Sequence, residues 1–288
     1  DPDNAHCVKI LPFLGEYSWS VVIASLILTV CVAAVLIGGV KRIASVSQIV
    51  VPFMAILYFA FAVILIICNI TEIPAAIKVI VTAAFTPKAV TGGAVGSMFV
   101  AMQKGVARGI FSNEAGLGSA PIAAAAAQTK EPVRQGLVSM TGTFIDTIVI
   151  CTLTGLSIVL TGAWQVEGLE GVEVTTYAFQ QGLPFPPAMS SFVLMLCLVF
   201  FAFTTILGWD YYSERCLEYL SGGNLKHVKV YRWIYIFAVF IGPYMTVSAV
   251  WTIADIFNGL MALPNMIALF ALSGVVVRET KAFFKKQS

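Results

Sequence analysis

The chain has 288 residues, of which 59% are hydrophobic and only 11% are charged, and its formal net charge is +2. A soluble domain carries roughly 25% charged residues, whereas here the apolar residues gather in runs of about 20, the length that crosses a bilayer as an α-helix. The composition therefore indicates an all-α polytopic membrane protein in contact with lipid, and it gives no basic-aromatic surface that would bind nucleic acid.

The residue types needed for an enzyme are poorly placed. Both histidines, His6 and His227, lie outside the apolar runs, so neither fits a membrane-embedded triad or metal centre. The sequence has no phosphate-binding loop, and its cysteines lack metal-ligand spacing. We expect a protein that is not an enzyme, has free thiols and needs no cofactor.

The first part of the chain predicts two membrane spans followed by an outer loop. Lys41 and Arg42 stand between the two spans and indicate a cytoplasmic linker there. The predicted segments are an extracellular-side loop over 1–18, spans over 19–40 and 49–70, and an outer loop over 71–93 with a short interfacial helix over 75–85.

The apolar stretch 94–127 is too long for one simple crossing, and its middle is polar and rich in glycine. Gly116, Gly118 and Pro121 weaken helix continuity beside Ser112 and Asn113. Backbone that leaves helical form at membrane depth is tolerated only inside protein or beside a water-filled cavity. We therefore expect a discontinuous helix whose break forms part of a polar solute site, as in secondary transporters.

The remaining chain predicts four further spans. The loop 162–187 contains glutamates but no Lys or Arg and indicates the outside, whereas 210–232 and the tail 279–288 indicate the cytoplasm. The predicted spans cover 136–161, 188–209, 233–250 and 264–277, the third with a kink at Gly242 and Pro243. Residues 251–263 are expected to be a broken or interfacial helix. The total is seven crossings, with the carboxyl end inside. The chain opens on Asp1, so we expect a piece of a longer protein.

The chemistry of the break suits a zwitterion. Backbone N–H groups at the start of a second half-helix suit a carboxylate, and carbonyls that end the first half suit a cation or an ammonium group. Ser112 and Asn113 can add hydrogen bonds from their side chains. The alternative is that the glycines only allow close helix packing.

Two cations and an acid lie near this break. Lys104 and Arg108 stand four residues apart on one helix face, either as a gate or vestibule or within a structural ion pair with Glu114 or Asp146. Glu114 can hold a cation, bind an amine or pair with Arg108. Asp146 is either a proton or cation relay or a structural anchor between helices.

The later span over 188–209 offers two adjacent hydroxyls, Thr204 and Thr205, which suit a hard monovalent ion. The alternative for them is hydrogen bonding to their own helix backbone. Trp209 either walls a small pocket or sits in the aromatic belt at the membrane interface.

Residues 105–121, GVARGIFSNEAGLGSAP, closely resemble the signature of the alanine or glycine:cation symporter family. Four weaker matches keep the family order across nearly the whole chain: 38–44, 51–55, 144–147 and 254–265.

The resemblance implies a fold of the amino acid–polyamine–cation type, with two inverted repeats of five helices. Residues 19–93 would hold the last two helices of an incomplete first repeat, and 94–278 would hold the second repeat. It further implies inward transport of alanine or glycine with sodium across the cell membrane.

The resemblance also implies roles for individual residues. The substrate site would be lined by Phe111, Ser112, Asn113, Glu114, Ala115 and Gly116, with Trp209 limiting its volume. The sodium ion would be bound by Thr204 and Thr205 and by the carbonyl group of Phe201.

Three features depart from the family pattern. Ala124 stands where members usually have a histidine, and Asp210 is an unusual acid next to Trp209. The first three core helices are absent, so this chain alone is expected to be unable to transport. We therefore expect part of a sodium-coupled symporter for a small neutral amino acid. The rival hypotheses are a non-transporting amino acid sensor or subunit, and a proton-coupled transporter that uses Asp146 or Glu114.

Overall fold

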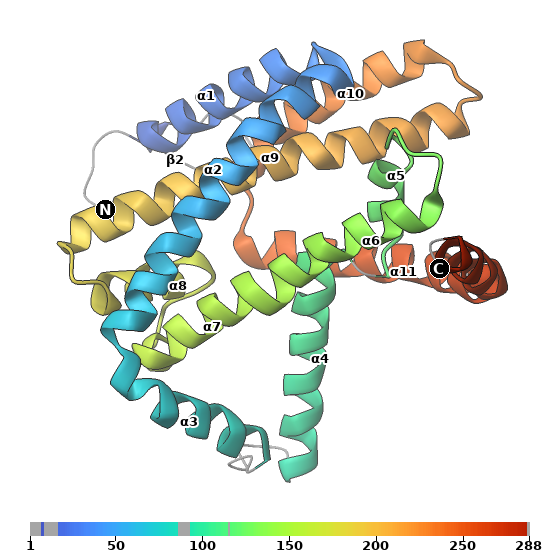
Figure 1. The fold of residues 1–288 in the computed structure, drawn as a ribbon. Coiled ribbons are helices and arrows are strands. Elements are labelled where there is room, and N and C mark those ends of the chain that lie inside the picture. Colours follow the sequence, from blue (N-terminus) through green and yellow to red (C-terminus); the bar gives the residue numbers. More distant parts are fainter. Residues whose placement is uncertain (1–6, 9–16, 86–92, 115, 287–288) are drawn as a thin grey trace. The chain divides into compact units, whose positions relative to one another are not determined.

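The computed structural model describes residues 7–8, 17–85, 93–114 and 116–286, and most of these are helical (Figure 1). Two short strands, β1 (Cys7–Val8) and β2 (Tyr17–Ser18), pair antiparallel near the start of the chain. The chain divides into two compact units, one formed by residues 1–54 and 198–256 and the other by residues 55–197 and 257–288. Three long helices pass from one unit into the other: α2 (Gly39–Cys68), α9 (Pro187–Leu220) and α11 (Val247–Lys285).

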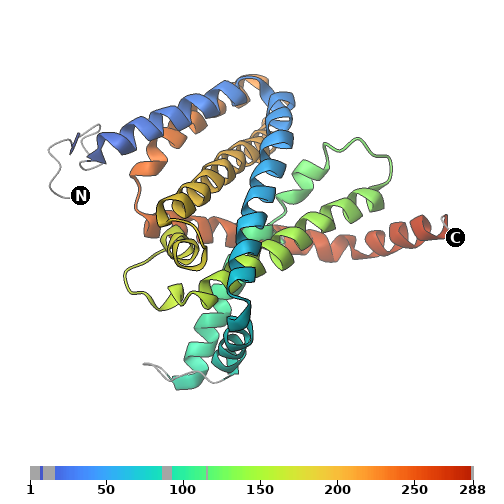
Figure 2. The ribbon, with the colours of Figure 1, turned by 60° about the vertical axis from the view of Figure 1, so that its left-hand side comes forward.

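The first unit is built around two neighbouring helices, α1 (Trp19–Leu36) and α10 (Leu225–Ile241), which lie side by side in Figures 1 and 2. The Ser25 hydroxyl joins them by donating a 2.8 Å hydrogen bond to the Phe240 carbonyl. A cluster of buried apolar side chains fixes their packing: Val32, Val35, Leu36, Ile43, Leu207 and Ile236. After α10 the chain passes through a 3₁₀ turn, η4 (Gly242–Tyr244), and an extended residue, Met245, before α11 begins.

The second unit contains a continuous helical rod made of three parts. These parts are α6 (Pro132–Thr143), a π-helical segment η2 (Phe144–Ile150) and α7 (Cys151–Leu160). In Figure 1 the end of α4 (Gly93–Asn113) meets this rod, and α4 packs against η2. Shorter elements complete the unit: η1 (Ile70–Glu72), α3 (Ile73–Phe85), α5 (Ala120–Ala124), η3 (Ala163–Gln165) and α8 (Val172–Gly182).

Side-chain contacts join α2, α7 and α8 within the second unit. The Tyr58 and Thr154 hydroxyls lie 2.5 Å apart, and the Tyr58 ring stacks on Phe179 with ring centroids 5.6 Å apart. The Asn69 amide donates to the Gly182 carbonyl at 2.9 Å. These contacts bury polar groups in pairs, as a low-dielectric interior requires.

Five helical stretches in the described part of the chain are long and apolar enough to cross a membrane: Trp19–Leu36, Gly39–Cys68, Pro132–Leu160, Pro187–Leu220 and Val247–Lys285. Large apolar side chains point out of these helices, among them Ile56, Phe192 and Phe270, which are 69%, 68% and 75% exposed. Apolar surface of this extent suits lipid rather than water. The prediction of an all-α membrane protein is confirmed at this level, while the number of crossings and the inverted repeats stay predictions.

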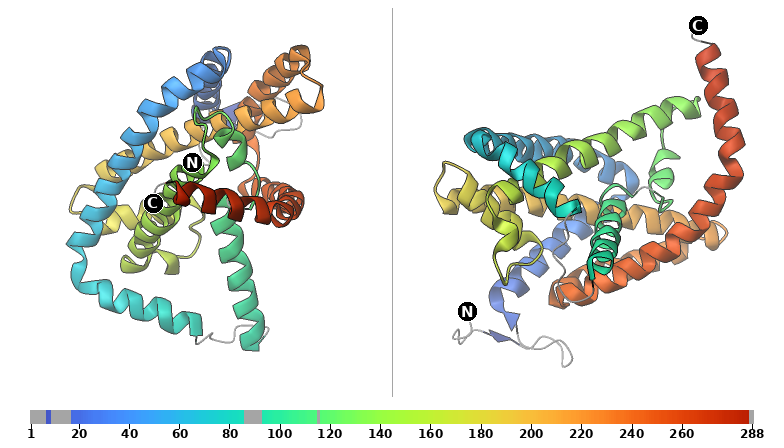
Figure 3. Two further views of the ribbon diagram at one scale, coloured as in Figure 1. Left: turned by 45° about the vertical axis from the view of Figure 1, so that its right-hand side comes forward. Right: turned by 90° about the horizontal axis from the view of Figure 1, so that it is seen from below.

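Several predicted boundaries are wrong. Residues 41–48 are not a linker but the first turns of α2, and α9 continues to Leu220 instead of stopping at 209. The kink expected at Gly242 and Pro243 is a 3₁₀ turn, η4, which follows the end of α10 at Ile241 and interrupts the predicted span over 233–250. The segments 251–263 and 264–277 belong to one helix, α11, which contains Pro264 and changes direction along its length in the right-hand view of Figure 3.

Candidate functional site

The predicted break in the 94–127 segment is present. Helix α4 ends at Asn113, and the next three described residues with unusual backbone geometry are Glu114, Gly116 and Gly118, whose φ angles are +56°, +84° and +83°. Such left-handed conformations end helices, and they favour glycine because it has no Cβ. Ala115 lies outside the described residues. The polar stretch therefore interrupts the helix where its glycines predict it.

Glu114 accepts hydrogen bonds, through its backbone and its side chain, from residues that follow it in the break. Its carbonyl accepts a 3.2 Å hydrogen bond from the Leu117 N–H, and its Oε2 accepts a 2.7 Å bond from the Ser119 hydroxyl. Leu117 and Ser119 are both buried. Glu114 is the one non-glycine with positive φ among the described residues, and the bond to Ser119 helps to offset the strain of that conformation.

The second half of the interrupted segment is shorter than predicted. Helix α5 covers only Ala120–Ala124, and residues 125 and 126 form a turn. A single turn of helix has a weak macrodipole. The predicted half-helix extending to 127, whose amino end would hold a substrate carboxylate, is therefore wrong in its length, and we assign no anion site to it.

The polar end of α4 is bonded to the π-helical segment η2. The Ser112 hydroxyl donates to Asp146 Oδ2 at 2.8 Å and lies 3.7 Å from Cys151 Sγ, while the Asn113 amide donates to Thr147 Oγ1 at 3.0 Å. A π-helical segment is rare and is frequent at functional sites. The structure thus brings together three residues singled out from the sequence, Ser112, Asn113 and Asp146.

Helix α11 approaches the break closely. A Cβ atom built on Gly118 would lie 3.1 Å from Cγ and Oδ1 of Asn265 and 3.2 Å from its Cβ. Asn265 directly follows Pro264, which lies inside α11. Sequence reasoning gave Asn265, Ser119 and Thr147 no role of their own, although all three fall in the family-like stretches.

The cations of α4 lie toward its carboxyl-terminal half. Lys104 is exposed, and the Arg108 guanidinium carbon lies 5.8 Å from the centre of the Phe111 ring. Phe111 is 37% exposed, so its ring is available both to Arg108 and to a neighbour or ligand. A gate or vestibule role for Lys104 and Arg108 stays a prediction.

The predicted sodium ligands lie on α9, in the first unit. The Thr204 hydroxyl donates to the carbonyls of Phe200 and Phe201, at 2.9 and 3.2 Å, which is the backbone bonding expected of a threonine in a membrane helix. The Thr204 oxygen keeps its lone pairs for a cation, and Thr205 is exposed. Trp209 meets Tyr212 edge to face, with ring centroids 5.7 Å apart.

The predicted sodium ligands on α9 are neutral oxygens and not a cluster of metal-binding side chains. Within the described ranges no group of three or more His, Cys, Asp or Glu residues could hold a metal ion. The oxygens near Thr204 on α9 are hydroxyls and carbonyls, which suit a hard monovalent cation. Their chemistry fits sodium.

Known proteins similar to this chain are membrane transporters. The sodium:alanine symporter family matches residues 10–288. An uncharacterized transporter of Haemophilus influenzae is 55% identical over 92% of this chain and 58% of its own length. The sodium/alanine symporter AgcS of Methanococcus maripaludis is 47% identical over 91% of the chain and 56% of its own.

A third relative differs in its named substrate. The probable sodium/glutamine symporter GlnT of Bacillus subtilis is 37% identical over 96% of this chain and 56% of its own length. The chain thus spans somewhat more than half the length of these relatives. Since the family match covers nearly every residue, the chain belongs to the sodium:alanine symporter family.

Proposed function

We propose that the protein is a secondary active transporter of the cell membrane, with its carboxyl end in the cytoplasm, that carries a small neutral amino acid inward with sodium by alternating access. The observation that carries the proposal is the interrupted helix at 114–119, bonded to a π-helical segment, within a chain of this family. Interrupted helices bind substrate and coupling ion in transporters with inverted repeats. The proposed fold is the amino acid–polyamine–cation type.

The substrate site in this proposal lies at the carboxyl end of α4, over residues 111–116. The last carbonyl groups of a helix lack intrahelical partners, so those of α4 suit the ammonium group of an amino acid. Ser112 and Asn113 orient the substrate through their side chains, and Phe111 contributes an apolar face. A small site of this kind favours alanine or glycine.

The sodium site in this proposal uses the hydroxyls of Thr204 and Thr205 and the carbonyl of Phe201. The Thr204 hydroxyl oxygen lies 3.2 Å from the Phe201 carbonyl oxygen, so two of the three proposed ligand oxygens are close together. Thr205, the next residue along α9, adds a third oxygen. Further ligands would come from outside this set, because hard cations take about six oxygens or more.

A second candidate, proton coupling, is favoured by one observation. Asp146 lies in the π-helical segment and accepts a hydrogen bond from Ser112 beside the break. Protonation of this carboxyl group would change that bond at the end of the interrupted helix. Asp146 can therefore relay a proton to the substrate site, and Glu114, bonded to Ser119, is the alternative acid.

Uptake into proteoliposomes that contain the full-length protein tests the proposal. Radiolabelled alanine, glycine and glutamine are supplied under an inward sodium gradient, an inward proton gradient, or neither. Accumulation of alanine or glycine with sodium alone supports the proposal, and accumulation with a proton gradient alone supports the second candidate. Absence of uptake under both gradients, together with binding of alanine by the purified protein, would instead indicate a sensor or subunit.

A further inference from the structure

Asp210, on α9, is a buried acid without a hydrogen-bond partner. It is 0% exposed, and neither of its carboxyl oxygens has a hydrogen-bond partner among the described residues. Such groups are rare in folded proteins, and each one calls for a physical explanation. The predicted sodium and substrate sites do not account for Asp210.

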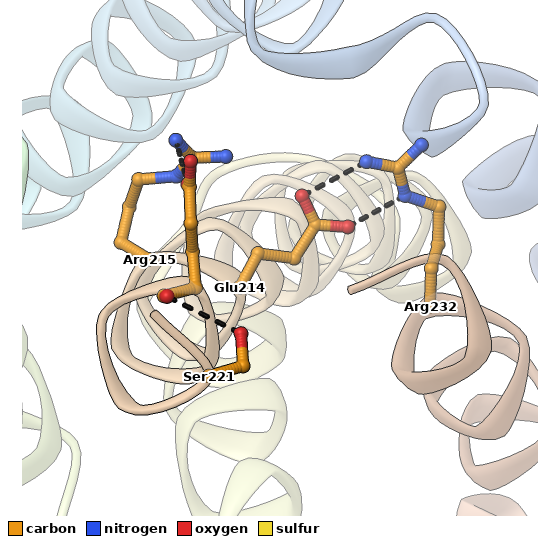
Figure 4. A network of polar contacts seen from close by, with 5 residues as sticks. Glu214, Arg215, Ser221 and Arg232 are labelled. Carbon is orange, nitrogen blue, oxygen red and sulfur yellow. Dashed lines mark hydrogen bonds and ion pairs between the residues drawn. The ribbon is translucent and has the colours of Figure 1, made fainter. Parts of the chain in front are cut away.

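The nearest charges cannot neutralise this carboxyl group. Glu214, one turn further along α9, is 4% exposed and accepts two hydrogen bonds from Arg232 of α10, at 2.5 and 2.9 Å (Figure 4). This fork joins one negative and one positive charge and uses both oxygens of Glu214. An ionised Asp210 would therefore add one unbalanced negative charge to a buried pair.

Arg215, the other arginine drawn in Figure 4, points away from that pair. It forms an ion pair with Glu218, which is one turn further along the same helix, and its guanidinium carbon lies 5.6 Å from the Tyr211 ring centre. Its contacts are thus made on a different side of α9 from Glu214. Arg215 provides no countercharge for Asp210.

Two tyrosines of α10, Tyr231 and Tyr235, lie within electrostatic reach of Asp210. The Tyr235 hydroxyl is used elsewhere, because it donates a 2.8 Å hydrogen bond to the Ile206 carbonyl. The titratable groups around Asp210 are therefore Glu214 on its own helix and Arg232, Tyr231 and Tyr235 on α10.

Burial of an ionised carboxylate without a partner carries an effective penalty of several kcal/mol, and such a group keeps its proton instead. A metal cation is a poor alternative occupant, because hard cations require many oxygens and the described residues hold no group of three or more His, Cys, Asp or Glu side chains that could bind one. A proton needs one acceptor. We propose that Asp210 is a proton-binding site, occupied by a single proton in the packing of α9 against α10 that the first unit shows.

The site is separate from the proposed sodium ligands. Thr204 and Thr205 precede Asp210 on α9 by six and five residues, which is about 7.5–9 Å along the helix axis. The inference does not depend on the proposed function, because it requires only the buried carboxyl and its neighbours. Loss of the proton would create a second buried anion that competes with Glu214 for Arg232.

Infrared spectroscopy of the purified full-length protein tests this inference, because a protonated carboxyl group absorbs separately from a carboxylate. With ¹³C-labelled aspartate, wild-type protein at neutral pH should show an isotope-shifted acid band, and Asp210→Asn should lose one acid band per chain. The control, Glu167→Gln, removes an exposed loop carboxyl and should leave the band in place. The band should also persist when sodium is raised at constant pH.

Three outcomes would overturn the inference: no labelled acid band in the wild-type protein, a band that survives in Asp210→Asn, or a band that sodium converts into a carboxylate band. The wild-type measurement needs no variant, so the inference stays testable if Asp210→Asn does not fold. Asp210→Glu gives a second check, since it keeps an acid at the position but should remove the isotope shift of the band.

Discussion

The Ser112 hydroxyl donates a 2.8 Å hydrogen bond to Asp146, which lies 34 residues further along the chain. The bond joins the last turn of the interrupted helix α4 to the π-helical segment η2 of the rod formed by α6 and α7. Next to it, the Asn113 amide donates to Thr147 at 3.0 Å. Two consecutive residues at the end of one helix are thus bonded to two consecutive residues of the other, and this fixes where the break begins.

A double-mutant cycle should show coupling between Ser112 and Asp146. Ser112→Ala and Asp146→Asn each remove part of the same bond to a charged group, so the loss in the double variant should be smaller than the sum of the single losses. The coupling free energy should be about 0.5–3 kcal/mol, measured by denaturant unfolding in detergent. Additive losses, within about 0.3–0.5 kcal/mol, would show that the bond contributes nothing to stability.

Gly118→Ala should destabilise the protein through two separate effects. The left-handed backbone, with φ of +83°, disfavours any residue with a Cβ by about 1–2 kcal/mol, and the new atom would also lie 3.1 Å from the Asn265 side chain. Adding Asn265→Ala should restore only the steric part. The same unfolding measurement separates the two effects.

Gly109→Ala is the matched control for that experiment. Gly109 lies inside α4, its φ is not positive, and a Cβ there would meet nothing within 4 Å. Alanine in a helix interior is favoured over glycine by about 1 kcal/mol, so this variant should be as stable as the wild-type protein or more so. Equal destabilisation by both substitutions would refute the special role of the Gly118 conformation.

The break was predictable because its signals are local. Gly116 and Gly118 allow positive φ, and polar Ser112 and Asn113 are out of place in a plain membrane helix. The length of α5 was not predictable in the same way. Alanine-rich residues 120–127 have high helix propensity, yet the structure ends the helix at Ala124, so propensity alone does not set its length.

Other features had no local signal. Residues 144–150 have ordinary apolar periodicity, and nothing in it distinguishes a π-helical segment from an α-helix. Charged residues suggested that the helix near 209 stops, but Glu214 and Arg232 neutralise each other across two helices, so α9 continues to Leu220. Pro264 suggested a boundary that α11 instead accommodates within its length.

Arg232→Met should strongly destabilise the first unit. It leaves the buried Glu214 without its countercharge, and breaking a buried ion pair from one side typically reduces stability by about 3–5 kcal/mol. Adding Glu214→Gln should recover most of the loss, because no charge then remains unpaired at that position. Denaturant unfolding of the three variants provides the comparison, and a double variant less stable than Arg232→Met would contradict it.

Thr204→Ala and Thr205→Ala should both weaken the sodium dependence of transport. Thr205→Ala should do so with the smaller effect on the helix itself, because the Thr204 hydroxyl is bonded to the backbone of α9. Thr204 donates to the carbonyls of Phe200 and Phe201, so its loss also perturbs the backbone of α9, whereas Thr205 is exposed to the surroundings of the helix. Each substitution should raise the sodium concentration for half-maximal alanine uptake about tenfold, which corresponds to about 1.4 kcal/mol.

Thr252→Ala is the control for these two variants. The Thr252 hydroxyl donates to the Ser248 carbonyl of its own helix, α11, at 2.9 Å, so its loss should leave the sodium response unchanged. An unchanged sodium response in both Thr204→Ala and Thr205→Ala would remove these hydroxyls from the proposed sodium site.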